Sequence, residues 1–129
     1  MLATRNRLRA SADFSNTVRS GVRNGRRNLV LYAALSAADE PTKVGFIVAK
    51  TVGNAVARNL VKRRLREAAA ATVRQNPAGL NIVVRALPVS AGSCWPELVK
   101  DYQNACLKTL DRLAAGRVAA PDKEGNNTP

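Results

Sequence analysis

The stretch Val52–Glu67, which reads VGNAVARNLVKRRLRE, predicts a helix with one apolar side and one cationic side. Gly53 and Asn54 supply a turn and an N-cap, so we expect the helix to begin at Ala55 and to continue to about Gln75. At about 100° per residue, a narrow apolar stripe comprises Ala57, Val61, Leu65, Ala68 and Thr72. This stripe predicts a fold in which the helix packs on a sheet.

The other side of this helix carries charge of one sign. It comprises Arg58, Asn59, Lys62, Arg63 and Arg66, and no acidic residue occurs between Lys50 and Glu67. Like charges four residues apart cost a helix a few tenths of a kcal/mol per pair. A solvated helix usually alternates Glu and Lys, so the pattern favours an anion-binding face. A membrane helix would carry bulky apolar residues where this one has alanines, and a helix-turn-helix would have a helix where Val44–Val48 reads as a strand.

The composition of the whole chain agrees with a polyanionic partner. The chain has 129 residues, of which 46% are hydrophobic, enough for one domain with a modest core. Lys and Arg outnumber Asp and Glu by 21 to 9, giving a net charge of +12. Nucleic acid or an anionic membrane surface is the leading partner class for such a charge. Neither a membrane-spanning run nor a secretory signal is recognisable, so we expect a cytoplasmic protein without a membrane partner.

The residues of catalytic and metal chemistry are scarce. The chain has no histidine, and its nine acidic residues are scattered along the sequence. Cys94 and Cys106 fall on one predicted helix, about 18 Å apart at 1.5 Å per residue, too far for a disulfide. We therefore predict no catalytic side chain and no metal site. Convergence of carboxylates in the fold, which an autonomous nuclease would need, stays open at this point.

The order of predicted elements indicates an α+β fold. Residues 1–10 read as a basic, extended arm and residues 116–129 as a disordered tail, leaving one domain within residues 1–115. A helix starts near Ser11, strands span Leu29–Leu35, Val44–Val48 and Leu80–Val84, a final helix starts near Ser93, and a short strand is optional near Gly21–Asn24. The first two of the three main strands suit an antiparallel hairpin. We expect an α/β sandwich whose central sheet has about four, mostly antiparallel strands.

Two aromatic residues are candidates for base stacking. Phe46 and Trp95 are assigned to the core, and Tyr102 belongs to the apolar stripe of the final helix. Phe14 and Tyr32 can either stack on unpaired bases, a contact worth roughly 1–3 kcal/mol per base, or pack in the core. Stacking beside a cationic helix would indicate a single-stranded nucleic acid with adjoining phosphates.

This combination resembles the protein subunit of bacterial ribonuclease P. The central motif of that family is similar to Arg58-Asn59-Leu60-Val61-Lys62-Arg63-Arg64-Leu65-Arg66. The likeness extends to Val44-Gly45, Lys50, Gly53-Asn54-Ala55-Val56, Arg5-Asn6-Arg7-Leu8, Asp13-Phe14, Gly21 and Leu31-Tyr32, and covers roughly residues 5–110. The resemblance also implies a left-handed strand–helix–strand crossover through the basic helix, which the general handedness rule would reject.

The resemblance implies a function as well. The family protein binds a catalytic RNA and the 5′ leader of precursor tRNA, and the RNA with its Mg²⁺ ions hydrolyses the phosphodiester bond that frees the mature 5′ end. No further protein partner is required. Carried over to this sequence, the leader cleft is lined by Phe14, Val18 and Tyr32, and the RNA-binding residues are Lys50, Arg58, Asn59, Lys62, Arg63 and Arg66.

Two positions depart from the family pattern. Leu60 stands where a second arginine is usual, and Val18 stands where an aromatic residue is frequent, so leader stacking rests on Phe14 and Tyr32. The alternative to a ribonuclease P subunit is a basic ribosome-associated or RNA-chaperone protein without specificity for precursor tRNA. Burial of both aromatic residues in the core would favour that alternative.

Overall fold

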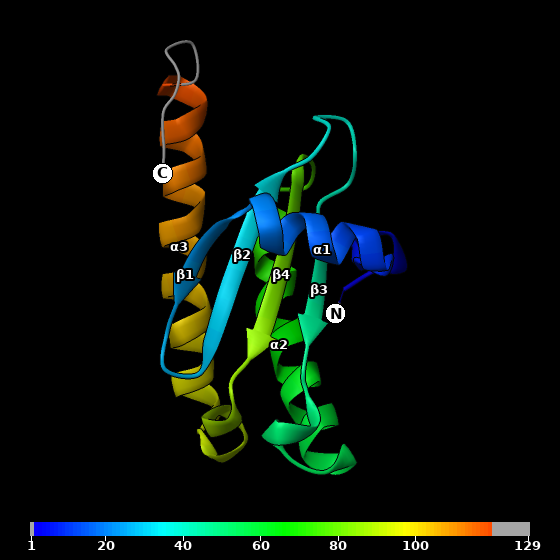
Figure 1. Cartoon of the computed structure of the whole chain (residues 1–129), viewed down its shortest axis with the longest axis vertical. Helices are drawn as coiled ribbons and strands as arrows, with labels where there is room; N and C mark the ends of the chain where they lie inside the picture. The colour runs from blue at the N-terminus through cyan, green and yellow to red at the C-terminus, as the bar shows by residue number, and fades with distance from the viewer. Residues whose placement is uncertain (1, 120–129) are drawn as a thin grey trace.

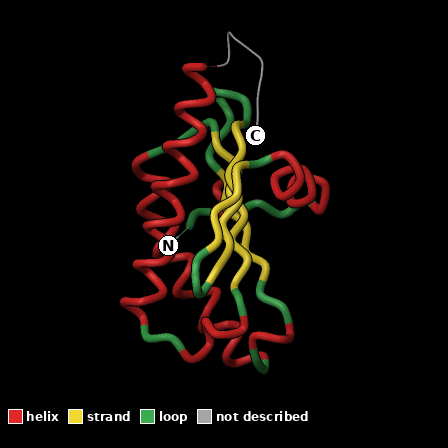
Figure 2. Tube along the Cα trace, turned by 60° about the vertical axis from the view of Figure 1, so that its left-hand side comes forward, coloured by secondary structure: helices red, strands yellow, loops and turns green. Residues whose placement is uncertain are grey.

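The computed structural model describes residues 2–119 and shows one four-stranded sheet with helices on both of its faces (Figures 1 and 2). The helices are α1 (Ser11–Ser20), α2 (Ala55–Gln75) and α3 (Trp95–Ala119), and the strands are β1 (Val22–Gly25), β2 (Leu29–Leu35), β3 (Lys43–Ile47) and β4 (Leu80–Ala86). Short 3-10 turns are η1 (Thr4–Asn6), η2 (Lys50–Val52) and η3 (Pro88–Gly92). The predicted α+β class is confirmed, with the optional strand present as β1. Helix α3 continues past Gly116, and the rest of the predicted tail lies outside the described residues.

The sheet has the order β1-β2-β4-β3. Strand β2 pairs antiparallel with both β1 and β4, while β3 pairs with β4 in parallel. The predicted hairpin between the second and third strands along the chain is therefore wrong, because β4 lies between them. Residues Ile82, Val83 and Val84 are fully buried, so β4 has apolar side chains on both faces, which suits the centre of a sheet rather than its edge.

The connection from β3 through α2 to β4 has the rare hand. Figure 1 shows both strands running downward, with β4 to the left of β3, α1 in front of the sheet and α2 behind it. A crossover of this geometry is left-handed, whereas nearly all such connections are right-handed. The hand implied by the family resemblance is confirmed.

The two faces of the sheet bury cores of different size. The larger core joins the sheet to α2 and α3 and includes Leu31, Ile82, Leu65, Leu98 and Tyr102. The smaller core lies under α1 and consists of Leu8, Val30, Tyr32 and Val83, with Phe14 and Val18 packed against it. Because α1 covers only part of its face, side chains of the sheet beside α1 remain accessible.

Helix α2 follows its sequence pattern closely. The Asn54 side-chain oxygen accepts a hydrogen bond from the Ala57 amide at 2.9 Å, which confirms the predicted cap. Val61 and Leu65 are buried in the larger core together with Ala69, whose small side chain brings the helix close to the sheet. The apolar stripe therefore faces inward and leaves the cationic face outside.

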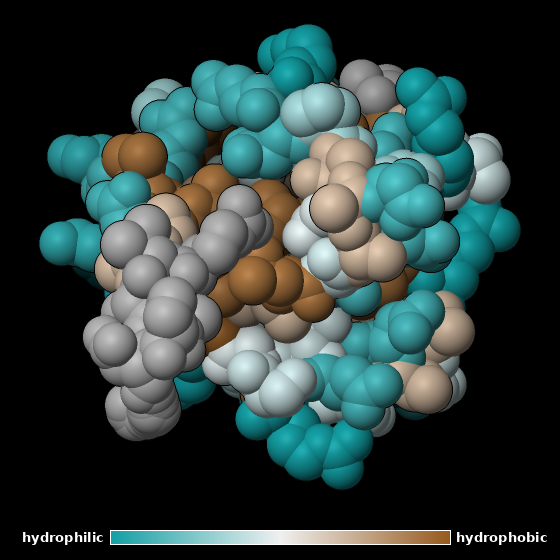
Figure 3. Space-filling view, turned by 90° about the horizontal axis from the view of Figure 1, so that it is seen from above, coloured by the Kyte–Doolittle hydropathy of each residue, from teal (hydrophilic) through white to brown (hydrophobic). Residues whose placement is uncertain are grey.

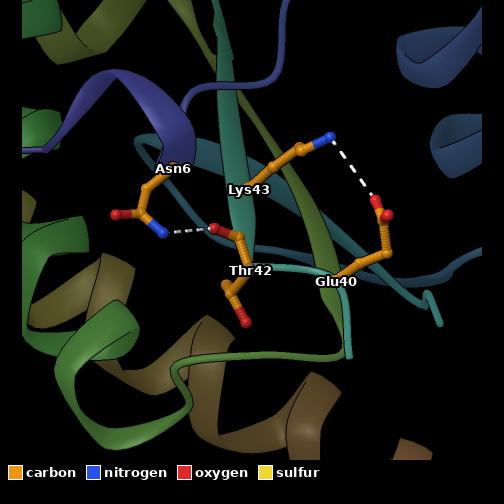
Figure 4. Close-up of polar contacts among 4 residues, drawn as sticks. All are labelled: Asn6, Glu40, Thr42 and Lys43. Atoms are coloured by element: carbon orange, nitrogen blue, oxygen red, sulfur yellow. Dashed lines mark hydrogen bonds and ion pairs between the residues drawn. The ribbon is translucent and has the colours of Figure 1, made fainter. Parts of the chain in front are cut away.

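The N-terminal arm is part of the folded domain. Leu2 and Leu8 are buried, one in each core, although the arm shows no apolar periodicity in the sequence. The buried Asn6 side chain donates a hydrogen bond to the Thr42 carbonyl at 2.8 Å (Figure 4). The Leu8 amide donates to the Val44 carbonyl at 3.1 Å. The arm thus covers the outer edge of β3, which would otherwise expose unpaired backbone groups.

At one end of the molecule, the residues that the structure describes leave part of the larger core uncovered. Viewed from above, apolar side chains gather in a hollow ringed by hydrophilic ones (Figure 3). Leu35, the last residue of β2, is 44% exposed at this end, and Leu110 and Leu113 of α3 are half-buried. Within residues 2–119, no helix combines the length and the hydropathy needed to cross a membrane.

Candidate nucleic-acid interface

A groove runs between α1 and the accessible part of the sheet. It is lined by Phe14, Ser15, Val18, Arg19, Ile47 and Arg85, and we call it the α1 groove. Phe14 and Val18 lie one helical turn apart on α1, so both point to the same side of the helix. Arg85 is the exposed residue of β4, and it places a guanidinium opposite these apolar side chains. The groove thus combines an aromatic ring with two cations.

Gly45 of β3 makes room for the Phe14 ring. A Cβ atom added at this position would overlap the ring and approach Cβ of Leu8 to 3.1 Å. The bare backbone of β3 therefore lets Phe14 lie against the sheet, half-buried, with part of its surface open. A side chain at residue 45 would push the ring outward.

A second depression lies at the edge of β3, between the arm and α2. This β3-edge pocket is lined by Arg7, Leu8, Arg9, Phe14, Val44, Gly45, Phe46, Lys62 and Arg66. The docked arm supplies two of its cations and α2 supplies the other two. Residues far apart in the sequence therefore converge because the arm is anchored along β3.

A third depression lies on the outer surface of α2. This α2 hollow is lined by Val56, Asn59, Leu60, Arg63 and Arg66. Val56 is 78% exposed, and Leu60 stands beside it where the family usually has an arginine. The departure at Leu60 therefore leaves an apolar patch flanked by two arginines, and Asn59 keeps its place on the same surface.

The three depressions follow one another around the molecule. Phe14 lines both the α1 groove and the β3-edge pocket, and Arg66 lines both the β3-edge pocket and the α2 hollow. Together they contain seven cations, two from the first, four from the second and one more from the third, and no acidic residue. We call this surface the RNA track. It offers phosphate-binding groups along a path that begins at an aromatic ring.

The positive charge of the RNA track is not neutralised by the protein. Among the side chains of residues 2–115, the one carboxylate within ion-pair distance of a cation is that of Glu40, 3.7 Å from the Lys43 amine (Figure 4). The Nε atoms of Arg7 and Arg58 are buried without a hydrogen-bond partner in the described structure. A phosphate bound on the track would supply the missing negative charge.

The structure brings most of the predicted site residues to the RNA track. Phe14, Val18, Asn59, Lys62, Arg63 and Arg66 all line it. Arg58 is half-buried one turn before Lys62, and Lys50 is exposed in η2 just ahead of α2. Tyr32 is only 6% exposed beneath α1, so it supports the floor under Phe14. Of the two candidate stacking residues, Phe14 has the more accessible ring.

Four cations of the RNA track are absent from the predicted site. Arg85 is the one charged residue in a strand that is otherwise almost entirely buried, and a charge in an apolar strand indicates a side chain that reaches the surface. Arg7 and Arg9 alternate with the buried Leu8, which also indicates side chains on the outer side of the arm. Arg19 gave no signal, because its position depends on how α1 crosses the sheet.

Arg64 belongs to the central motif but serves the fold. Its guanidinium carbon lies 6.0 Å from the centre of the Trp95 ring, and its Nη1 donates to the Ser93 carbonyl at 3.4 Å. These contacts tie α2 to the start of α3, on the side away from the cationic face. A cation–π contact of this kind contributes about 0.5–1 kcal/mol to stability.

A buried polar cluster joins α2 to α3 on the side of the sheet opposite the α1 groove. The hydroxyls of Thr72 and Tyr102 lie 2.7 Å apart, and the Cys106 sulfur lies 3.6 Å from the Thr72 hydroxyl. Burial raises the pKa of both Tyr102 and Cys106 above their ordinary values. Cys94 and Cys106 are both free thiols, as the predicted spacing requires.

Comparisons with known proteins agree on one family. The family model for Ribonuclease P matches residues 2–110. The ribonuclease P protein component of Pseudarthrobacter chlorophenolicus is 65% identical over 127 residues, covering 97% of this chain and 93% of that protein. The corresponding protein of Kocuria rhizophila is 56% identical over 114 residues, covering 88% of this chain and 100% of that protein.

Solved structures show the same fold. The Staphylococcus aureus RNase P protein superposes with a TM-score of 0.71 at 24% identity, covering 78% of this chain and 92% of that one. The Thermotoga maritima protein gives a TM-score of 0.67 at 24% identity, covering 78% and 94%. With the family match over most of the sequence, these likenesses lead to one conclusion: the chain belongs to the ribonuclease P protein family.

Proposed function

We propose that the RNA track binds two RNA ligands, the 5′ leader of precursor tRNA and the ribonuclease P RNA. As a member of its family, the chain is a protein component of ribonuclease P, the enzyme of tRNA 5′-end processing. The observation that supports the proposal is the continuity of the track, in which an aromatic ring and seven cations follow one another without an acidic residue. Single-stranded RNA is bound by such a combination of stacking and phosphate contacts.

The leader is assigned to the α1 groove. Phe14 supplies the stacking surface for an unpaired base, and Val18 contacts its flank. Arg19 and Arg85 lie along the same groove and bind the leader phosphates. The proposal thus keeps Phe14 and Val18 as leader-contacting residues, with Tyr32 packed beneath them.

The ribonuclease P RNA is assigned to the α2 side of the track. Lys62 and Arg66 stand where the β3-edge pocket passes onto α2, and Arg63 with Asn59 extends the surface along the helix. Arg58 and Lys50 lie at the start of the same helix and complete the set. Neutralising phosphates at this boundary reduces the repulsion between the leader and the ribonuclease P RNA, and the resulting affinity falls as salt rises.

The chemical step is assigned to the RNA subunit and its Mg²⁺ ions. In this proposal the protein holds no metal and supplies no nucleophile or base, and its contribution is to hold the leader beside the RNA. The complex works in the cytoplasm, without a membrane or a further protein. The family match does not favour the ribosome-associated alternative.

Reconstitution of precursor-tRNA cleavage at low Mg²⁺ tests the proposal. The reactions contain a bacterial ribonuclease P RNA alone, this protein alone, or both. We expect cleavage at the mature 5′ end that requires the RNA and is faster with the protein. Tight RNA binding without faster cleavage would support the RNA-chaperone alternative, and cleavage by the protein alone would show that its own side chains do the chemistry.

A further inference from the structure

A second group of cations lies at the opposite edge of the sheet from the β3-edge pocket. It consists of Arg23 in β1, Arg26 and Arg27 in the turn before β2, and Lys108 and Arg112 in α3, and we call it the β1-edge cluster. Its members are exposed, apart from the half-buried Arg26. The strand order places β1 and β3 at opposite edges, so the width of the sheet separates the cluster from the β3-edge pocket, and the α1 groove lies between the two. Figure 1 shows α3 running alongside β1.

Hydrogen bonds hold α3 against the β1–β2 hairpin at two levels. Near one end, Arg112 Nη1 donates to the Arg23 carbonyl at 3.3 Å. Near the turn, the backbone amide and the side-chain amide of Asn28 donate to one Asp101 oxygen, at 3.0 and 2.8 Å. Lys108 lies one helical turn before Arg112 and therefore on the same side of α3. The fold thus holds the hairpin and this side of α3, which carry the five cations, together at the β1 edge.

These contacts gather positive charge without neutralising it. The Nε atom of Arg26 donates to the side-chain oxygen of Asn24 at 2.9 Å, and Arg112 donates to a backbone carbonyl, so both acceptors are neutral. The nearby carboxylate of Asp101 accepts two hydrogen bonds from Asn28 and, among the described residues, makes no ion pair with a cluster member. In the described part of the chain, no cluster member is within ion-pair distance of a carboxylate. On a protein of charge +12, such a gathering costs repulsion that a bound polyanion would offset.

We propose that the β1-edge cluster binds the phosphates of a helical segment of the ribonuclease P RNA, a segment separate from the one on α2. The inference rests on the proposed function, which supplies RNA as the partner. The cluster has five cations and no aromatic residue, so it suits a phosphate backbone whose bases are already paired. With cationic surfaces at both edges of the sheet, the protein bridges two RNA segments.

The first test measures how salt affects binding to ribonuclease P RNA alone. The double variant Arg27→Ala/Lys108→Ala removes two exposed cations that make no side-chain hydrogen bond in the described structure. The matched control, Arg74→Ala/Lys100→Ala, removes two exposed cations outside both surfaces. We expect the cluster variant to flatten the log–log salt slope by about 1.8, the amount that two duplex phosphates contribute. We expect the control to leave the slope unchanged and both variants to keep the wild-type discrimination between precursor and mature tRNA.

A slope equal to that of the control would overturn the inference and mark the cluster as a solvated surface. A weakening seen with precursor tRNA but not with ribonuclease P RNA would also overturn it. Failure of the proposed function can be distinguished from failure of this inference. In the first case, the wild-type protein would bind the RNA without improving cleavage.

The second test maps the RNA segments directly. In a Cys94→Ser background, a cleavage reagent is attached to Arg27→Cys or to Asn59→Cys, with Cys106 buried in both. We expect the two probes to cleave different RNA segments in the assembled complex. Cleavage of one shared segment, or of none by the probe at residue 27, would show that the β1 edge does not meet a separate RNA helix.

Discussion

The Phe14 ring is the residue-scale centre of the RNA track, because it lies where the α1 groove meets the β3-edge pocket. Its position depends on a glycine beneath it in β3 and on a tyrosine in β2, two strands away. Gly45 leaves the space that the ring occupies, and the buried Tyr32 belongs to the small core that supports α1. The proposed leader site therefore depends on Gly45 and Tyr32, which support the ring rather than offer a stacking surface.

Gly45→Ala is expected to displace the Phe14 ring. The added methyl would overlap the ring, and overpacking of this kind destabilises a protein by about 1–3 kcal/mol. Denaturant unfolding should show the destabilisation, and binding of precursor tRNA should weaken while binding of mature tRNA does not. The double variant Gly45→Ala/Phe14→Ala should lose less stability than the sum of the losses in the two single variants. Its leader affinity should stay low. Additive effects on stability would contradict the contact.

Phe14→Leu separates stacking from packing. Leucine keeps an apolar side chain in the α1 groove but has no aromatic face. We expect the advantage of precursor over mature tRNA to fall by about 1–3 kcal/mol, with the free energy of unfolding changed far less than by Phe14→Ala. Equilibrium binding of both RNAs by the reconstituted complex measures this difference. An unchanged advantage in the leucine variant would show that no base stacks on residue 14.

At the scale of the element, α2 is a helix with two separate roles. Its buried stripe, with Val61 and Leu65, holds the helix on the sheet, and its outer face carries the cations of the RNA track. Arg64 lies apart from that face and contacts Trp95 instead. Arginine and lysine residues of one short motif are therefore divided between contacts that hold the fold and the cationic face to which we assign RNA binding.

This division predicts different outcomes for neighbouring charge deletions. Lys62→Ala or Arg66→Ala should lower the log–log salt slope of RNA binding by about one unit for each phosphate that the variant no longer binds. Arg64→Ala removes the same charge from the same helix, yet it should leave the slope unchanged and lower stability by about 0.5–1 kcal/mol. Salt titrations and denaturant unfolding of the three variants distinguish these effects. Equal slopes for all three variants would contradict the assignment of the cationic face.

At the scale of the whole molecule, buried groups at the junction of α2 and α3 should make the folded protein less stable at alkaline pH. In the unfolded chain, Cys106 and Tyr102 titrate near their ordinary pKa values of 9.0 and 10.0, whereas burial raises the pKa of both in the folded protein. Above pH 9 the unfolded state therefore binds fewer protons than the folded state. The contribution of these two groups to the free energy of unfolding is fully present below their unfolded-state pKa values. It declines as pH rises above them, by up to about 1.4 kcal/mol per pH unit for each group.

Denaturant unfolding between pH 7 and about pH 11 measures this dependence. Tyr102→Phe removes the hydroxyl, so it should flatten the decline above pH 10 while costing some stability at pH 7, because the bond to Thr72 is no longer made. Cys106→Ala should flatten the part of this decline in stability that begins near pH 9. A decline equally steep in wild-type protein and in both variants would show that these groups are not its source.

Much of the molecule was predictable from short stretches of sequence. The bounds of α2 follow from the Asn54 cap and the apolar stripe, and the class of partner follows from the net charge of +12. The resemblance of the central motif identified the family and the left-handed crossover, which no local pattern indicates. The sequence could have predicted that Arg85 reaches the surface, because it is a charged residue in an apolar strand. It could not have predicted that Arg85 lies in the same groove as Phe14.

By itself, the sequence determined the helices, the cationic face of α2 and the preference for a polyanion, because capping, periodicity and charge act within a few residues or over the whole composition. Only the tertiary structure decided that β4 separates β2 from β3, that Asn6 anchors the arm along β3, and that Phe14 is accessible while Tyr32 is buried. These features arise from contacts between residues distant along the chain, whose free energies no single stretch contains. The RNA track exists because such contacts bring the arm, α1, β4 and α2 together around one edge of the sheet.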